Sequence, residues 1–168
     1  MRSLRASLAL LLLGLAGHLS AQSPTSSLHL QNGGHQTTVT LDALKAMPQT
    51  TVKFHNVHTS VDETYSGVPL IDLLASLGAP HGKDLHGKGL SDYIIATGSD
   101  GYKAVLALAE VDPEFHPGDV IVADAMDGKP LDAKNGPFKL VVTEDKRPAR
   151  SVHNLVSIEM KTADLPRP

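Results

Sequence analysis

The chain has 168 residues, a formal net charge of −3, and neither cysteine nor tryptophan. The absence of cysteine excludes disulfides, thiol catalysis, thiolate metal sites and iron–sulfur clusters. The acidic balance and the scarcity of aromatic side chains argue against nucleic acid, an anionic membrane, or a stacked sugar or base as the partner.

Residues 1–21 have the pattern of a secretory signal peptide. Arg2 and Arg5 precede an apolar run over residues 8–17 that is too short to span a bilayer. Small residues at the end of this segment predict cleavage after Ala21, and a retained N-terminal anchor is the alternative. We therefore expect a periplasmic or secreted protein, with no membrane association once the signal has been removed.

Residues 22–36 are expected to form a loose N-terminal segment, although residues 28–31 alternate like a short strand. The folded domain is expected over residues 37–162, and residues 163–168 form a C-terminal tail.

Two short helices are expected inside this domain. Thr40 can cap a helix over residues 41–47, and Pro69 suits the first turn of another that ends at Gly78. Asp100-Gly101 and Asp127-Gly128 are turn signals. Strands are expected at residues 37–41, 50–57, 93–97, 102–106, 120–123, 137–143 and 152–160. Because strands outnumber helices without regular alternation, the sequence predicts an α+β domain with a mixed β-sheet and short helices.

The familiar catalytic and metal-binding motifs are missing. The nine histidines do not have zinc-finger or HExxH spacing, and no GxSxG, GxGxxG or P-loop motif occurs. His55 and His58 lie three apart in a predicted strand, so their side chains would point to opposite faces. Scattered, solvated histidines are the expected reading.

A basic group stands out near the C-terminus. Lys139, Lys146, Arg147, Arg150 and His153 fall within fifteen positions. Two adjacent strands could bring several of them to one sheet end and form a pocket for an anion or phosphate. The alternative is a charged, solvated hairpin loop.

Several blocks resemble the sulfite-oxidase-type oxidoreductase molybdopterin-binding domain family. Residues 65–74 read YSGVPLIDLL, similar to the family's W/F-x-G-V-x-L-x-D-L-L block. Residues 99–102 resemble its core hairpin, residues 120–142 (VIVADAMDGKPLDAKNGPFKLVV) its long block ending G-x-P-x-R-L-V-V-P, and residues 151–155 (SVHNL) its S-V-K-W-L. The resemblance covers roughly residues 37–160 and is nearest to small secreted members that consist of this domain alone.

The resemblance implies a mixed α+β domain that binds a molybdopterin cofactor and acts on small oxyanions or sulfoxides. It also implies a molybdenum-ligating cysteine before Gly67, where this chain has residues 54–59 and no sulfur. The family's arginine falls on Lys139, its lysine on His153 and its tryptophan on Asn154.

Two functions follow as hypotheses. The first is a non-catalytic secreted module that binds a small anion, a pterin-type ligand or a periplasmic protein partner. The second is an atypical molybdopterin-dependent oxidoreductase. In that case the cofactor-binding residues would be Lys139, Arg150 and His153 around the phosphate, with His55 or Asn56 as a weak substitute ligand.

Overall fold

The computed structural model describes residues 26–57 and 59–163. The expected signal peptide and residues 164–168 of the expected tail lie outside the described residues. Within the described ranges, no helix is long and apolar enough to cross a membrane.

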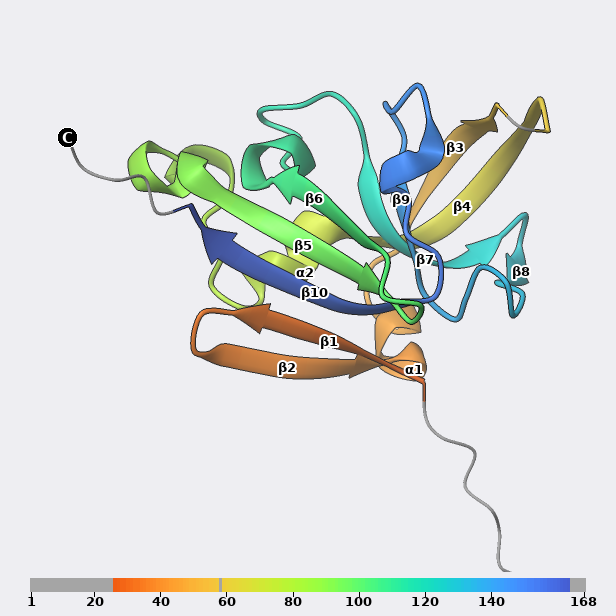
Figure 1. The fold of residues 1–168 in the computed structure, drawn as a ribbon, viewed down its shortest axis with the longest axis horizontal. Coiled ribbons are helices and arrows are strands. Elements are labelled where there is room, and N and C mark those ends of the chain that lie inside the picture. Colours follow the sequence, from red (N-terminus) through yellow and green to blue (C-terminus); the bar gives the residue numbers. More distant parts are fainter. Residues whose placement is uncertain (1–25, 58, 164–168) are drawn as a thin grey trace, which may run out of the picture.

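The strands form two five-stranded sheets, which we call sheet A and sheet B (Figure 1). Sheet A has the order β2-β1-β10-β5-β6, and sheet B has the order β3-β4-β7-β8, with β9 also pairing with β7. The strands of sheet A are β1 (Ser27–Asn32), β2 (His35–Thr40), β5 (Asp92–Gly98), β6 (Lys103–Ala107) and β10 (Leu155–Thr162). Those of sheet B are β3 (Thr50–Asn56), β4 (Val61–Pro69), β7 (Val120–Met126), β8 (Lys129–Pro130) and β9 (Lys139–Val142).

Helices are short and connect the strands. The two α-helices are α1 (Leu41–Lys45) and α2 (Leu70–Ala75). The 3-10 turns are η1 (Gly82–Asp84), η2 (Gly87–Ser91), η3 (Leu108–Val111) and η4 (Pro148–Arg150). Thr40 caps α1 as expected, because its hydroxyl accepts the backbone N–H of Ala43 at 3.2 Å. This arrangement confirms the α+β class with mixed sheets and few helices.

The main core joins the two sheets and buries α2. Alternate residues of several strands point into it, including Leu28 and Leu30 of β1 and Val120 and Val122 of β7. A second, smaller cluster covers the opposite face of sheet B. It contains Val52, Phe54, Tyr65, Ile121, Ala123 and Val141. The centre of sheet B is therefore buried on both faces, which explains why all four residues of β9 are buried.

The expected loose segment over residues 22–36 needs correction at its C-terminal part. β1 lies between β2 and β10, with His29 beside Ser157 in the parallel pair. Leu28 and Leu30 are 0% and 1% exposed, so burial of these leucines holds the segment in sheet A. The folded domain thus begins about ten residues before position 37.

The sequence analysis also missed β4. This strand carries polar side chains through its first half, where it pairs only with β3, and so it lacks an apolar alternation. Its second half pairs with β7, and the register shifts between Ser66 and Gly67. The shift skips Asp124 of β7 and is therefore a β-bulge. Tyr65 and Val68 are three residues apart in β4 and face opposite sides of the sheet, so Tyr65 enters the second cluster and Val68 enters the main core.

Gly67 makes this bulge sterically feasible, and its substitution tests that conclusion. A Cβ atom at Gly67 would overlap the Val122 carbonyl and the Cα atom of Ala123. We expect Gly67→Ala to lower the free energy of unfolding by more than about 2 kcal/mol, measured by urea denaturation. Gly34→Ala is the control, because nothing lies within 4 Å of its Cβ position, and its effect should stay within about 0.5 kcal/mol. Equal effects of the two substitutions would contradict the packing argument.

Candidate functional site

Lys139 lies in β9 and is buried against sheet B. Its residue is 5% exposed, and its Nζ donates to the Tyr65 hydroxyl at 2.6 Å and to Asn135 Oδ1 at 3.3 Å. The same Nζ stands 4.4 Å from the centroid of the Tyr65 ring, which is a cation–π distance. Burial lowers the pKa of Lys139, while the negative charges of Glu63 and Asp132 act in the opposite direction. The amine of Lys139 therefore donates its hydrogen bonds to groups of the protein itself.

The contact continues through Tyr65 into the β3–β4 hairpin. The Tyr65 hydroxyl donates to Glu63 Oε2 at 2.7 Å, and Asn56 Nδ2 donates to Glu63 Oε1 at 2.8 Å. Burial, followed by the hydrogen bond to Glu63, raises the pKa of Tyr65 and keeps the phenol neutral. Lys139, Tyr65, Glu63 and Asn56 therefore form one polar chain from β9 to the tip of β3.

His55 does not join this chain. Its Nδ1 lies 2.6 Å from Asp62 Oδ1 across the hairpin, and both side chains are largely exposed. Neighbouring residues of a strand face opposite sides, which separates His55 from Asn56. In the described residues no group of three or more His, Cys, Asp or Glu side chains could hold a metal ion.

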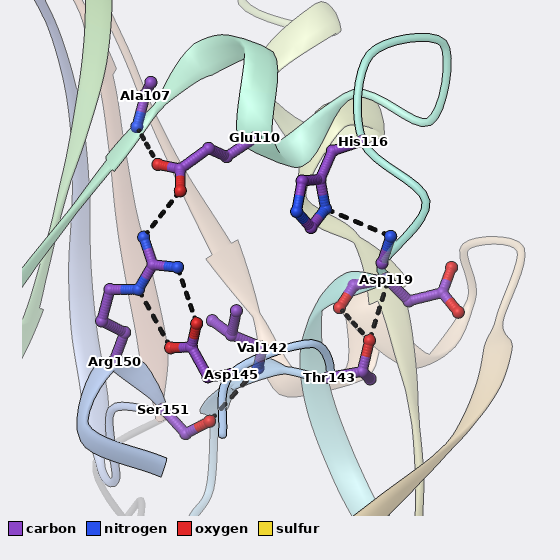
Figure 2. A network of polar contacts seen from close by, with 10 residues as sticks. Ala107, Glu110, His116, Asp119, Val142, Thr143, Asp145, Arg150 and Ser151 are labelled. Carbon is purple, nitrogen blue, oxygen red and sulfur yellow. Dashed lines mark hydrogen bonds and ion pairs between the residues drawn. The ribbon is translucent and has the colours of Figure 1, made fainter. Parts of the chain in front are cut away.

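Arg150, at the end of η4, is held by two carboxylates (Figure 2). Its Nε and Nη2 donate to the two oxygens of Asp145 at 2.9 and 2.7 Å, and its Nη1 donates to Glu110 Oε1 at 2.9 Å. The hydrogen bonds to Asp145 and Glu110 raise the pKa of Arg150. Burial acts to raise the pKa of Glu110, but the hydrogen bonds from Arg150 and from the Ala107 backbone, together with the positive charge of Arg150, lower it. Glu110 Oε2 also accepts the backbone N–H of Ala107 at 2.7 Å. Arg150 thus fixes the 145–151 segment to η3.

A pocket of about 660 Å³ lies beside this segment. Three parts of the chain meet there: the 147–153 segment, the β5–β6 turn and the tip of the β3–β4 hairpin. Its lining residues are Val57, Asp100, Tyr102, Arg147, Pro148, Ala149, Ser151 and His153. The Tyr102 hydroxyl donates to the carbonyl of Ala149 at 2.6 Å, which joins two walls of the pocket.

Two members of the basic cluster, Arg147 and His153, line the pocket. Neither forms an ion pair with any residue in the described part of the chain. Partial burial lowers the pKa of His153, and the charges of Lys139 and Lys134 lower it further. His153 is therefore mostly neutral near pH 7.

The five expected cofactor-binding residues are not gathered at one point. Lys139 is near enough to His153 to lower its pKa, but its amine is bound by Tyr65 and Asn135. Arg150 is turned to Asp145 and Glu110, and only His153 lines the pocket. His55 and Asn56 contact acidic residues of the opposite strand of their hairpin.

Sequence reasoning did not select Arg147, Tyr65 or Tyr102. Arg147 was one of five basic residues with no signal to distinguish it. Tyr65 opens the YSGVPLIDLL block, yet its partner Lys139 lies 74 positions away. Only the pairing of β4 and β9 with β7 brings these two side chains together.

A family model described as the oxidoreductase molybdopterin binding domain matches residues 23–167. The chain belongs to this family. The match includes β1 and β2, in agreement with their place in sheet A. No curated protein matches the chain.

The crystal structure of the sulfane dehydrogenase SoxCD from Paracoccus pantotrophus has a similar fold. The TM-score is 0.61 at 17% sequence identity, and the similarity covers 80% of this chain. It covers 37% of the SoxCD chain, so this chain spans little more than a third of that relative's length. At such low identity the likeness concerns the fold, and it supports the sulfite-oxidase-like arrangement of mixed sheets.

A molybdenum centre held by a protein thiolate does not fit the residues of this family member. The chain has no cysteine, and the 54–57 segment supplies one imidazole and one amide that already contact Asp62 and Glu63. Lys139 and Arg150, which would meet the phosphate of a cofactor, are likewise bound to protein groups. A cofactor could use them only by displacing these partners.

The Lys139–Tyr65 contact can be tested with a double-mutant cycle. Tyr65→Phe keeps the ring but removes the oxygen, which leaves Lys139 with one long hydrogen bond to Asn135 and Glu63 without its phenol donor. We expect a loss of about 1–3 kcal/mol in the free energy of unfolding. Lys139→Met removes the buried charge and should cost less than about 1 kcal/mol.

The double variant should lose less stability than the two single losses added together, because the unsatisfied amine is gone. Urea denaturation of the four proteins measures this coupling. Additive effects, or a Lys139→Met loss as large as that of Tyr65→Phe, would show that the contact contributes nothing specific.

Proposed function

We propose that this chain is a secreted, non-catalytic member of the oxidoreductase molybdopterin binding domain family that binds a small anion. The observation that carries the proposal is the division of the basic cluster. Lys139 and Arg150 are bound by protein groups, whereas Arg147 and His153 line one pocket without an ion-pair partner in the described residues. Cationic side chains that converge on a pocket favour an anionic ligand.

The same division supports a binding function over redox catalysis. Molybdenum chemistry in this family depends on a ligand set that includes a thiolate, and no sulfur donor of that kind exists in the chain. The polar chain from Lys139 to Asn56 joins β9 to the β3–β4 hairpin, and its side chains are already hydrogen-bonded to one another. Secretion rests on the signal pattern of residues 1–21.

Metal and pterin analysis separates this proposal from an atypical oxidoreductase. Protein exported by its native host should contain neither molybdenum, by elemental analysis, nor the fluorescence of an oxidised pterin. Stoichiometric molybdenum or pterin would overturn the non-catalytic assignment. A cysteine-containing member of the family, purified in parallel from the same host, shows that the procedure retains the cofactor.

Anion binding can be measured by calorimetric titration with methanesulfonate and sulfate. We expect Arg147→Gln to weaken binding at least about tenfold, as befits the loss of a charge-assisted hydrogen bond. Lys146→Gln is the matched control. It removes the same charge from the residue next to Arg147, and the side chain of Lys146 does not line the pocket. Equal losses in both variants would indicate screening by overall charge and overturn the proposed site.

The pH dependence follows from His153. Its pKa lies below the ordinary 6.5, because burial, Lys139 and Lys134 outweigh Asp132 and Asp100. Protonation below that pKa adds a positive charge beside Arg147, so the affinity for a sulfonate should rise as the pH falls from 7 to 5. His153→Gln should abolish the rise, and a rise that persists in this variant would assign the effect to another group.

A further inference from the structure

The walls of the pocket are more apolar than a site for an inorganic anion requires. Val57, Pro148, Ala149 and the ring of Tyr102 line it together with Arg147 and His153. Val57 and Tyr102 are 46% and 50% exposed, so much of their apolar surface is open to the pocket and to solvent. A ligand that carried only charge would leave these surfaces in water.

The apolar walls are also held in position. The hydrogen bond from the Tyr102 hydroxyl to the Ala149 carbonyl joins the start of β6 to η4. On the other side, Arg150 clamps the same segment to Asp145 and Glu110 (Figure 2). Arg150 thus acts as a positioning residue for the wall that carries Arg147, and the pocket does not depend on a ligand to form it.

The charges of the pocket favour a ligand with a single negative charge. Arg147 contributes one positive charge, and the carboxylate of Asp100 lines the same pocket. Asp100 is oriented by the backbone N–H of Tyr102, which its Oδ1 accepts at 2.9 Å. A dianion would meet both a cation and a fixed carboxylate, and like charges at close range disfavour each other.

We infer that the pocket takes an organic monoanion, a sulfonate or carboxylate attached to an apolar body. The anionic head would meet Arg147 and His153, and the apolar body would cover Val57, Tyr102 and Pro148. This inference rests on the proposed function, since it specifies the ligand class of the same site. A volume of about 660 Å³ is in the range of small-molecule sites and accommodates one aromatic ring with its head group.

Three probes with related head groups test the inference at pH 8 by calorimetric titration. Methanesulfonate carries the head alone, benzenesulfonate adds an apolar ring, and phenyl phosphate keeps the ring but is a dianion at this pH because its second pKa is near 6. Benzenesulfonate should bind at least about tenfold more tightly than methanesulfonate, because the ring buries apolar surface. It should also bind more tightly than phenyl phosphate.

Three variants sharpen the test. Val57→Thr should weaken benzenesulfonate binding and leave methanesulfonate unchanged, whereas Val61→Thr, on the same hairpin but away from the pocket, should change neither. Asp100→Asn keeps an oxygen for the Tyr102 N–H and should raise the affinity for phenyl phosphate relative to benzenesulfonate.

The outcomes distinguish this inference from the proposed function. If methanesulfonate binds through Arg147 but the ring adds no affinity, the organic ligand is ruled out and small-anion binding stands. Tighter binding of phenyl phosphate than benzenesulfonate would overturn the preference for a monoanion. If no probe binds, both the inference and the proposed function fail.

Discussion

The arrangement of sheet B depends on the buried contact between Lys139 and Tyr65. A lysine amine is costly to bury, and here a phenol, an amide and an aromatic face together replace the water that it loses. The two residues come from β9 and β4, which lie on opposite sides of β7. Their contact therefore spans β7 and helps to close the second cluster.

The same contact limits the chemistry available beside it. The amine of Lys139, the hydroxyl of Tyr65 and the carboxylate of Glu63 satisfy one another, so none is left as a free acid, base or cation. Arg150 is satisfied in a comparable way by Asp145 and Glu110. Arg147 and His153 of the same basic cluster instead line the pocket beside η4. Membership of the molybdopterin-binding family thus describes the scaffold, and the site on it has different donors.

Local signals in the sequence were enough for most of the elements. The Asp100-Gly101 turn, the Thr40 cap and the termination of α2 near Gly78, where φ is +81°, each depend on a few neighbouring residues. β4 was not predicted, because its burial depends on pairing with β7 and on the bulge beside Gly67. Neither of these is visible in the local sequence. The place of β1 depends in the same way on β10, more than a hundred residues away.

The candidate site could be predicted only in part. The basic cluster predicted an anion pocket, and two of its members, Arg147 and His153, line one pocket. Whether a basic side chain is already bound by an acidic one depends on residues far away in the sequence. Arg150, for example, is bound by Glu110, which lies 40 positions from it in the chain. Tyr65 and Lys139 are separated still further. Spacing along the sequence cannot show such pairs, since they arise from the packing of strands.

The position of β10 has a consequence for how the protein is made. β10 lies between β1 and β5, so the strand completed last joins the N-terminal hairpin to the rest of sheet A (Figure 1). While the ribosome is still adding residues 155–162, β1 and β2 have no neighbour to pair with beyond each other. Sheet A can therefore be assembled only after β10 has been synthesised, and the long separation between β1 and β10 favours slow folding.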